Sequence, residues 1–154
     1  MNMRFERGGI PGSHSSTKDI GSQEKRWQDV LQKSLGENYP VNILSFENME
    51  MEDFKQFNQK LKEFVKERTA NINSTRMRKI YEIVKNSKNE KELLLSLPRL
   101  AYIVGREDRD KESVGLVITL LSEAILAMKT NDDFKGIQKC AEAMVAYHKY
   151  FSKN

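Results

Sequence analysis

The chain has 154 residues, a formal net charge of +4 and a single cysteine. This length favours one domain with a sizeable core, and the mild basicity favours polyanionic partners without proving them. The lone Cys140 excludes a disulfide framework and a cysteine-based zinc site, and with two histidines we expect no metal ion or other cofactor. No N-terminal apolar segment typical of secretion is present, and the longest apolar run, 114–121, is too short to span a bilayer. We therefore expect a soluble, cytoplasmic protein.

Residues 1–22 contain several glycines, a proline and a serine/threonine cluster, but no periodic apolar residues. This composition is typical of flexible chain. We therefore expect a flexible N-terminal tail at 1–22 and a helical bundle domain at 23–154. At the start of that domain the sequence predicts a short helix over 24–35 and then a loop over 40–47.

From residue 51 onward, apolar residues recur every three or four positions, which places them on one face of a helix. This spacing predicts helices over about 51–70, 75–85, 90–105, 110–129 and 132–151. Pro98 has no backbone N–H to donate, so the third of these should kink or restart near Leu97. The fourth is apolar nearly all round, as expected of a central buried helix. No alternating strand pattern competes, so we predict an all-α fold, a single-domain bundle of about five main helices.

A catalytic constellation is not visible in this sequence. It contains no HExxH, no glycine-rich phosphate loop and no GxSxG motif. Cys140 lies next to the apolar stripe of the last predicted helix, which indicates a buried, inert thiol. His148 lies on or beside the same stripe, where a packed imidazole bonded to a neighbour is favoured over catalysis. We therefore predict that the protein is not an enzyme.

The basic residues are concentrated in one predicted helix. Within 71–89, five basic residues stand against Glu82 as the single acid: Arg76, Arg78, Lys79, Lys85 and Lys88. Arg78 and Lys85 are seven positions apart and therefore share a face, with Tyr81 between them. A basic face with an aromatic side chain suits a phosphate backbone and an unstacked base. A lysine-rich helix that is simply solvated explains the same pattern equally well.

A second polar and aromatic face is predicted in the segment 97–106. Arg99, Tyr102 and Arg106 are spaced three and four apart and lie beside the leucine stripe. Binding of nucleic acid or a partner is slightly favoured here over two arginines that extend around a packed tyrosine. The last helix has a similar flank at Tyr147, Lys149 and Tyr150, where half-buried tyrosines are the simpler explanation.

Three segments point to a known family: TRMRKIY at 75–81, LPRLAYIVGR at 97–106 and VAYHKYF at 145–151. In this order and spacing, within an all-helical chain, they resemble the small subunit of type III-A CRISPR interference complexes, the Csm small-subunit family. The resemblance covers about half of the chain. Arg78 and Lys79 occupy matching places in the family's arginine-lysine-aromatic helix start, whereas Arg76 departs from it.

The resemblance implies a non-catalytic small subunit of an antiviral ribonucleoprotein complex. Such subunits line up along the backbone of the complex and help to hold target RNA paired with guide RNA, while other subunits cut nucleic acid. The implied partners are other CRISPR effector subunits, target RNA, the guide–target duplex and neighbouring copies of the chain.

No catalytic residue and no metal ligand is predicted. The candidate RNA-binding residues are Arg76, Arg78, Lys79, Lys85, Arg99, Tyr102, Arg106 and Lys149. Two alternatives remain open at this point. One is a helical protein-interaction scaffold, and the other is a helix-turn-helix DNA binder with 74–85 as its recognition helix.

Overall fold

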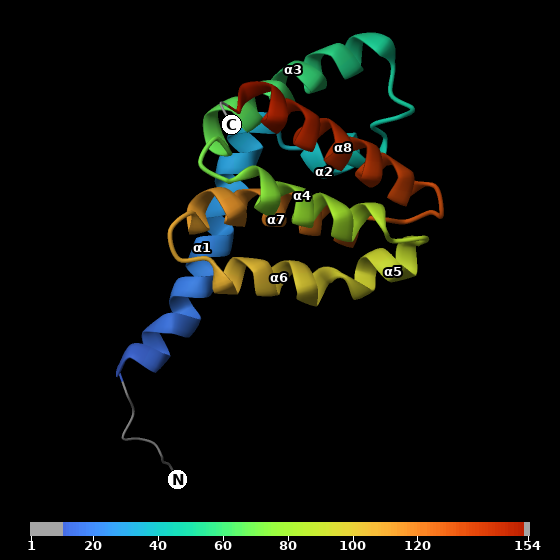
Figure 1. Cartoon of the computed structure of the whole chain (residues 1–154). Coiled ribbons are helices and arrows are strands. Elements are labelled where there is room, and N and C mark those ends of the chain that lie inside the picture. Colours follow the sequence, from blue (N-terminus) through green and yellow to red (C-terminus); the bar gives the residue numbers. More distant parts are fainter. Residues whose placement is uncertain (1–10, 153–154) are drawn as a thin grey trace.

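The computed structural model describes the backbone of residues 11–152 and the side chains of residues 21–152. This part of the chain forms eight α-helices and no strand (Figure 1). The helices are α1 Pro11–Leu35, α2 Tyr39–Leu44, α3 Met51–Arg68, α4 Ser74–Lys85, α5 Glu90–Leu95, α6 Leu97–Arg106, α7 Lys111–Leu126 and α8 Asp133–Phe151. The all-α class is confirmed. The expected number of helices was too low, because α2 was not expected and the segment 90–105 forms two helices.

The first helix begins earlier than the sequence pattern indicates. α1 begins at Pro11 rather than near Glu24, and a proline is tolerated in a first turn because its missing N–H would have no helical partner there. Farther along, Trp27, Leu31 and Leu35 recur every four residues and are buried. Residues 1–10 of the predicted tail lie outside the described part, so the boundary at residue 22 stays a prediction.

The expected loop over 40–47 is largely helical, and that prediction was wrong. Pro40 lies in the first turn of α2, where it costs no hydrogen bond. Tyr39 and Ile43 are one helical turn apart, and both are buried. Burial of this pair therefore stabilises a short helix at a position where proline had suggested a break.

The central helix of the bundle is α7. It packs against α1, α2, α5, α6 and α8, and its side chains from Val114 to Val117 are all buried. This confirms the prediction of a helix that is apolar on nearly all sides. Leu126 at its end is an exception, because 64% of its surface is exposed. None of the described helices is both long and apolar enough to cross a membrane.

Two helices on one side of α7 position the candidate site. α4 packs chiefly on α8, and α6 packs chiefly on α7. In Figure 1, α4 lies in front of α7, α8 lies above α4, and α6 lies below α4. α6 restarts directly after Ser96 with Pro98 in its first turn, as the sequence predicted. α4 begins after Asn73, whose side chain accepts a hydrogen bond of 2.7 Å from the backbone N–H of Arg76.

Candidate nucleic-acid interface

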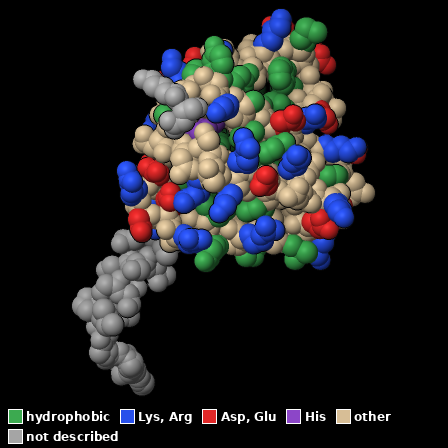
Figure 2. Space-filling view, viewed as in Figure 1, with side chains coloured by type: hydrophobic (Ala, Val, Ile, Leu, Met, Phe, Trp, Pro, Cys, Tyr) green, Lys and Arg blue, Asp and Glu red, His purple; other side chains and the backbone are tan. Residues whose placement is uncertain are grey.

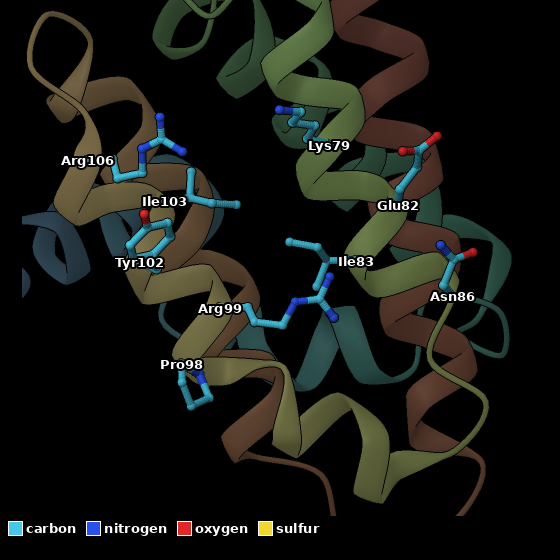
Figure 3. Close-up of a pocket in the computed structure, with 9 residues that line it drawn as sticks. All are labelled: Lys79, Glu82, Ile83, Asn86, Pro98, Arg99, Tyr102, Ile103 and Arg106. Carbon is cyan, nitrogen blue, oxygen red and sulfur yellow. The ribbon is translucent and has the colours of Figure 1, made fainter.

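An open groove of about 650 Å³ runs between α4 and α6. Side chains of both helices border it, and Lys79, Ile83, Arg99 and Ile103 extend toward the opposite helix (Figure 3). The lining residues are Lys79, Glu82, Ile83 and Asn86 from α4 and its C-cap, and Pro98, Arg99, Tyr102, Ile103 and Arg106 from α6. The groove lies between two helices that pack chiefly on different neighbours, α4 on α8 and α6 on α7.

The α6 wall carries the face predicted from sequence. Arg99, Tyr102 and Arg106 all line the groove, as their spacing of three and four residues requires. Tyr102 is 65% exposed, which is unusual for an aromatic ring that only fills a core. The guanidinium carbon of Arg106 lies 5.6 Å from the centroid of the Tyr102 ring. This cation–π contact holds a positive charge beside an accessible aromatic face.

The groove is predominantly positive. It brings together the cations of Lys79, Arg99 and Arg106, with Glu82 as the only carboxylate in its lining. In Figure 2, basic side chains gather over the part of the surface where Figure 1 shows α4 and α6. Cations in an open groove attract phosphates, and an exposed tyrosine offers a ring on which a base can stack.

The basic residues of α4 do not form one surface. Lys79 faces α6 in the groove, whereas Tyr81 and Lys85 line a separate hollow against α8. The ammonium group of Lys85 lies 5.9 Å from the centroid of the Tyr81 ring. Arg78 is exposed, and its spacing of seven residues from Lys85 places it on the same flank. The predicted face of Arg78, Tyr81 and Lys85 therefore turns toward α8, and Lys79 lies on the other side of the helix, in the groove.

Two further candidates lie outside the groove lining. Arg76 forms an ion pair with Glu107, the residue that follows α6, and the Glu107 side chain is only 12% exposed. This contact ties the start of α4 to the end of α6, so Arg76 helps to fix the groove. Lys149 is exposed near the end of α8. A direct contact of either residue with RNA stays a prediction.

Some residues of these surfaces were missed in the sequence. Ile83 and Ile103 add partly buried apolar surface to the groove, and Lys135 and Lys139 line the hollow between α4 and α8. The two lysines are four positions apart, so a pattern search could have placed them on one helix face. Nothing in the sequence shows that this face lies next to Tyr81.

The two reactive side chains considered above are buried. Burial raises the pKa of the Cys140 thiol to about 12, which keeps it protonated and unreactive. His148 is 4% exposed, and its Nε2–H donates to the carbonyl oxygen of Ile72 at 2.6 Å. Within residues 21–152, no three His, Cys, Asp or Glu side chains are placed to hold a metal ion.

The fold and the groove define a small all-α protein with an open, basic and aromatic surface. A family model described as Csm2 Type III-A matches residues 48–154, which is more than half of the chain, and the chain belongs to this family. The family is the small subunit of type III-A CRISPR complexes. The match confirms the resemblance seen in the three sequence segments and extends it to α3. Among curated proteins and among solved structures, none matches the chain.

Proposed function

We propose that this chain is a non-catalytic small subunit that helps to hold target RNA paired with guide RNA in a type III-A CRISPR complex. The observation that carries the proposal is the groove that is lined by Lys79, Arg99 and Arg106 together with the exposed ring of Tyr102. Copies of the subunit line up along the backbone of the complex, next to its other subunits, so that their grooves face successive parts of one RNA.

The grip is independent of base sequence. Lysine and arginine neutralise phosphates and release counterions, and this gain is the same for every base. Tyr102 adds stacking, which also tolerates any base. One groove offers few such contacts, so a single subunit binds weakly, and aligned copies on one RNA bind more tightly through effective concentration.

The two other functions considered from the sequence fit this geometry less well. A helix-turn-helix protein places the start of its recognition helix on base edges, but Arg76 at the start of α4 is engaged by Glu107. A scaffold that contacts only proteins would leave the cations of the groove without a role. The scaffold becomes the better explanation if charge removal there leaves RNA binding unchanged.

The test is a filter-binding titration of reconstituted complexes that carry wild-type subunit or the variant Arg99→Ala/Arg106→Ala. The variant should bind target RNA more weakly for every target sequence. The slope of log affinity against log salt should fall by close to one unit for each phosphate that the variant no longer neutralises. Folding should be unaffected, because substitutions of exposed residues usually change stability by less than about 0.5 kcal/mol.

A matched control removes two positive charges elsewhere, with Lys33→Ala/Lys60→Ala. These lysines lie on α1 and α3, away from the groove lining. The control should bind like wild type. Equal affinities and equal salt slopes for all three complexes would reject the groove as the RNA contact.

A further inference from the structure

A pocket of about 300 Å³ lies between α1, α6 and α7, apart from the groove. Apolar side chains form much of its lining: Trp27 of α1, Ala101 and Val104 of α6, and Ile118 and Leu126 of α7. Leu126 is 64% exposed, although it lies on the central helix. The volume is at the lower end for ligand sites, so the pocket suits one or two side chains of a docked segment.

Two carboxylates border this apolar surface. Glu24 lies on α1 and Glu123 on α7, whereas Lys111 is the one cation in the lining. The Glu123 carboxylate accepts a hydrogen bond of 3.1 Å from the side-chain amide of Gln28. Glu24 forms no ion pair within residues 21–152. On a chain with a net charge of +4, this locally negative pocket fits an apolar occupant that also carries a cation.

The N-terminal sequence of the chain offers such an occupant. Residues 3–7 read Met-Arg-Phe-Glu-Arg. In an extended chain alternate side chains point the same way, so Met3, Phe5 and Arg7 share one side. Aromatic and arginine side chains are the residues that most often anchor protein contacts. Two glycines follow directly, and they permit the sharp reversal that a returning segment needs.

The length of the chain lets this segment reach the pocket of its own molecule. In Figure 1, the first turns of α1 extend beyond the other helices. From Pro11, where α1 begins, Glu24 and Trp27 are thirteen and sixteen residues away, or about 20 and 24 Å along the helix. Phe5 and Met3 precede Pro11 by six and eight residues, or about 20 and 26 Å of extended chain. A segment that turns back along α1 therefore brings Phe5 level with Glu24 and Met3 level with Trp27.

We infer that residues 3–7 dock in this pocket of their own chain. The side chains of Met3 and Phe5 pack among its apolar residues. Arg7 lies nearer to Pro11, and its long side chain extends toward the Glu24 carboxylate. The inference does not depend on RNA binding, so its failure would leave the proposed function standing.

The docked segment braces α6 from behind. Of the ten residues of α6, Leu100 alone is buried, and the helix packs chiefly on α7. Ala101 and Val104 line the pocket, whereas Arg99 and Tyr102 line the groove on the other flank. The segment therefore adds contacts to α6 on the side away from the groove and steadies the wall that carries Tyr102.

The test uses a nitroxide label on the full chain. Because Cys140 is buried, Asn2→Cys provides the accessible thiol, and wild-type chain treated in the same way is the control for labelling of Cys140. Paramagnetic broadening of backbone amide NMR signals reports which residues lie near position 2. Signals of Ala101, Gly105 and Leu126 should broaden strongly, whereas those of 135–139 on α8 should not. An absence of broadening at the pocket would overturn the inference.

A mixed sample distinguishes docking within one chain from docking between chains. It combines labelled chain without ¹⁵N with unlabelled, ¹⁵N-enriched chain. Its pocket signals should stay sharp, because each segment occupies its own molecule. Broadening in the mixed sample would place the segment in the pocket of a neighbouring copy and would reject the inference.

Variants of the labelled chain test the contacts. Phe5→Ala should remove most of the broadening and speed amide exchange at 101–105. Ile10→Ala is the matched control, because Ile10 adjoins Pro11 and lies too far from the pocket, and it should change neither. Arg7→Glu should weaken the broadening, and Arg7→Glu/Glu24→Arg should restore it, since the exchanged charges still attract. The inference fails if broadening persists in Phe5→Ala or falls equally in Ile10→Ala.

Discussion

Two glycines allow helices of this bundle to approach more closely than any other residue would. A Cβ atom built on Gly136 of α8 would lie 2.2 Å from the carbonyl oxygen of Leu44, at the end of α2. A Cβ atom on Gly115 of α7 would lie 2.4 Å from the ring of Trp27. A backbone oxygen cannot rotate away as a side chain can, so Gly136 is the stricter of the two positions.

Gly136→Ala should therefore destabilise the protein, although alanine is the better helix former. The clash should cost about 1–3 kcal/mol or more, against a gain in helix propensity of about 1 kcal/mol. Gly105→Ala is the control, because nothing lies within 4 Å of its added Cβ. Urea denaturation should show a lower midpoint for the first variant and an unchanged or higher one for the second. Equal midpoints would mean that α8 and α2 can move apart at no cost.

At the scale of the element, apolar spacing and proline positions predicted most helices. They predicted less well which apolar side chains of a helix are buried. The break before Leu97 follows from the chemistry of Pro98, so it was visible in the sequence. At Pro40 a proline led to a wrong prediction. In the sequence alone, a proline in the first turn of a helix cannot be told from a proline in a loop, and the burial of Tyr39 that stabilises α2 is visible only in the structure. Met51 fits the apolar spacing of α3 but is 72% exposed, since it lies at the helix start, beyond the reach of the core.

In the candidate site, residue spacing predicted which side chains share a helix face, but not which helices lie side by side. A period of 3.6 residues placed Arg99, Tyr102 and Arg106 on one face of α6, and they share that face in the structure. It could not show that Lys79 joins them while Lys85 turns toward α8. That division depends on which helices pack beside α4, a matter of contacts between segments far apart in sequence.

The central position of α7 leads to a prediction at this scale. Leu121→Ala should destabilise the protein by about 2–5 kcal/mol, because it removes buried methyl groups and leaves a cavity. Leu121 is 1% exposed, whereas Leu126 on the same helix is 64% exposed. Leu126→Ala therefore serves as the control, with an expected change within about 0.5 kcal/mol. Chemical denaturation of both variants gives the comparison, and a decrease below about 1 kcal/mol for Leu121→Ala would contradict a core built around α7.

At the scale of the whole molecule, the helices share one core rather than forming separate packing units. α7 contacts helices from both ends of the chain, and α8 packs against α2, α3 and α4 as well. Buried residues from α1 through α8 belong to a single cluster. Such a core should unfold cooperatively. The groove between α4 and α6 is then presented by a rigid body.

Cys140 offers a test of this cooperativity, because it is the single cysteine of the chain and is fully buried. In the folded state, the raised pKa of about 12 keeps its thiol neutral at about pH 8. Alkylation by iodoacetamide requires the thiolate and access to it, so the reaction must proceed through an open state. If that state is the unfolded chain, labelling should be at least about 10³-fold slower than in denaturant.

The labelling rate should then follow global stability. Gly136→Ala should speed labelling about tenfold for every 1.4 kcal/mol that it removes, and Gly105→Ala should leave the rate unchanged or lower it. Both variants are measured at the same mildly alkaline pH without denaturant, alongside their urea midpoints. Rapid labelling at a rate that does not change with these midpoints would show that α8 opens locally. Lys135 and Lys139 on its exposed face would then not be held in place against α4.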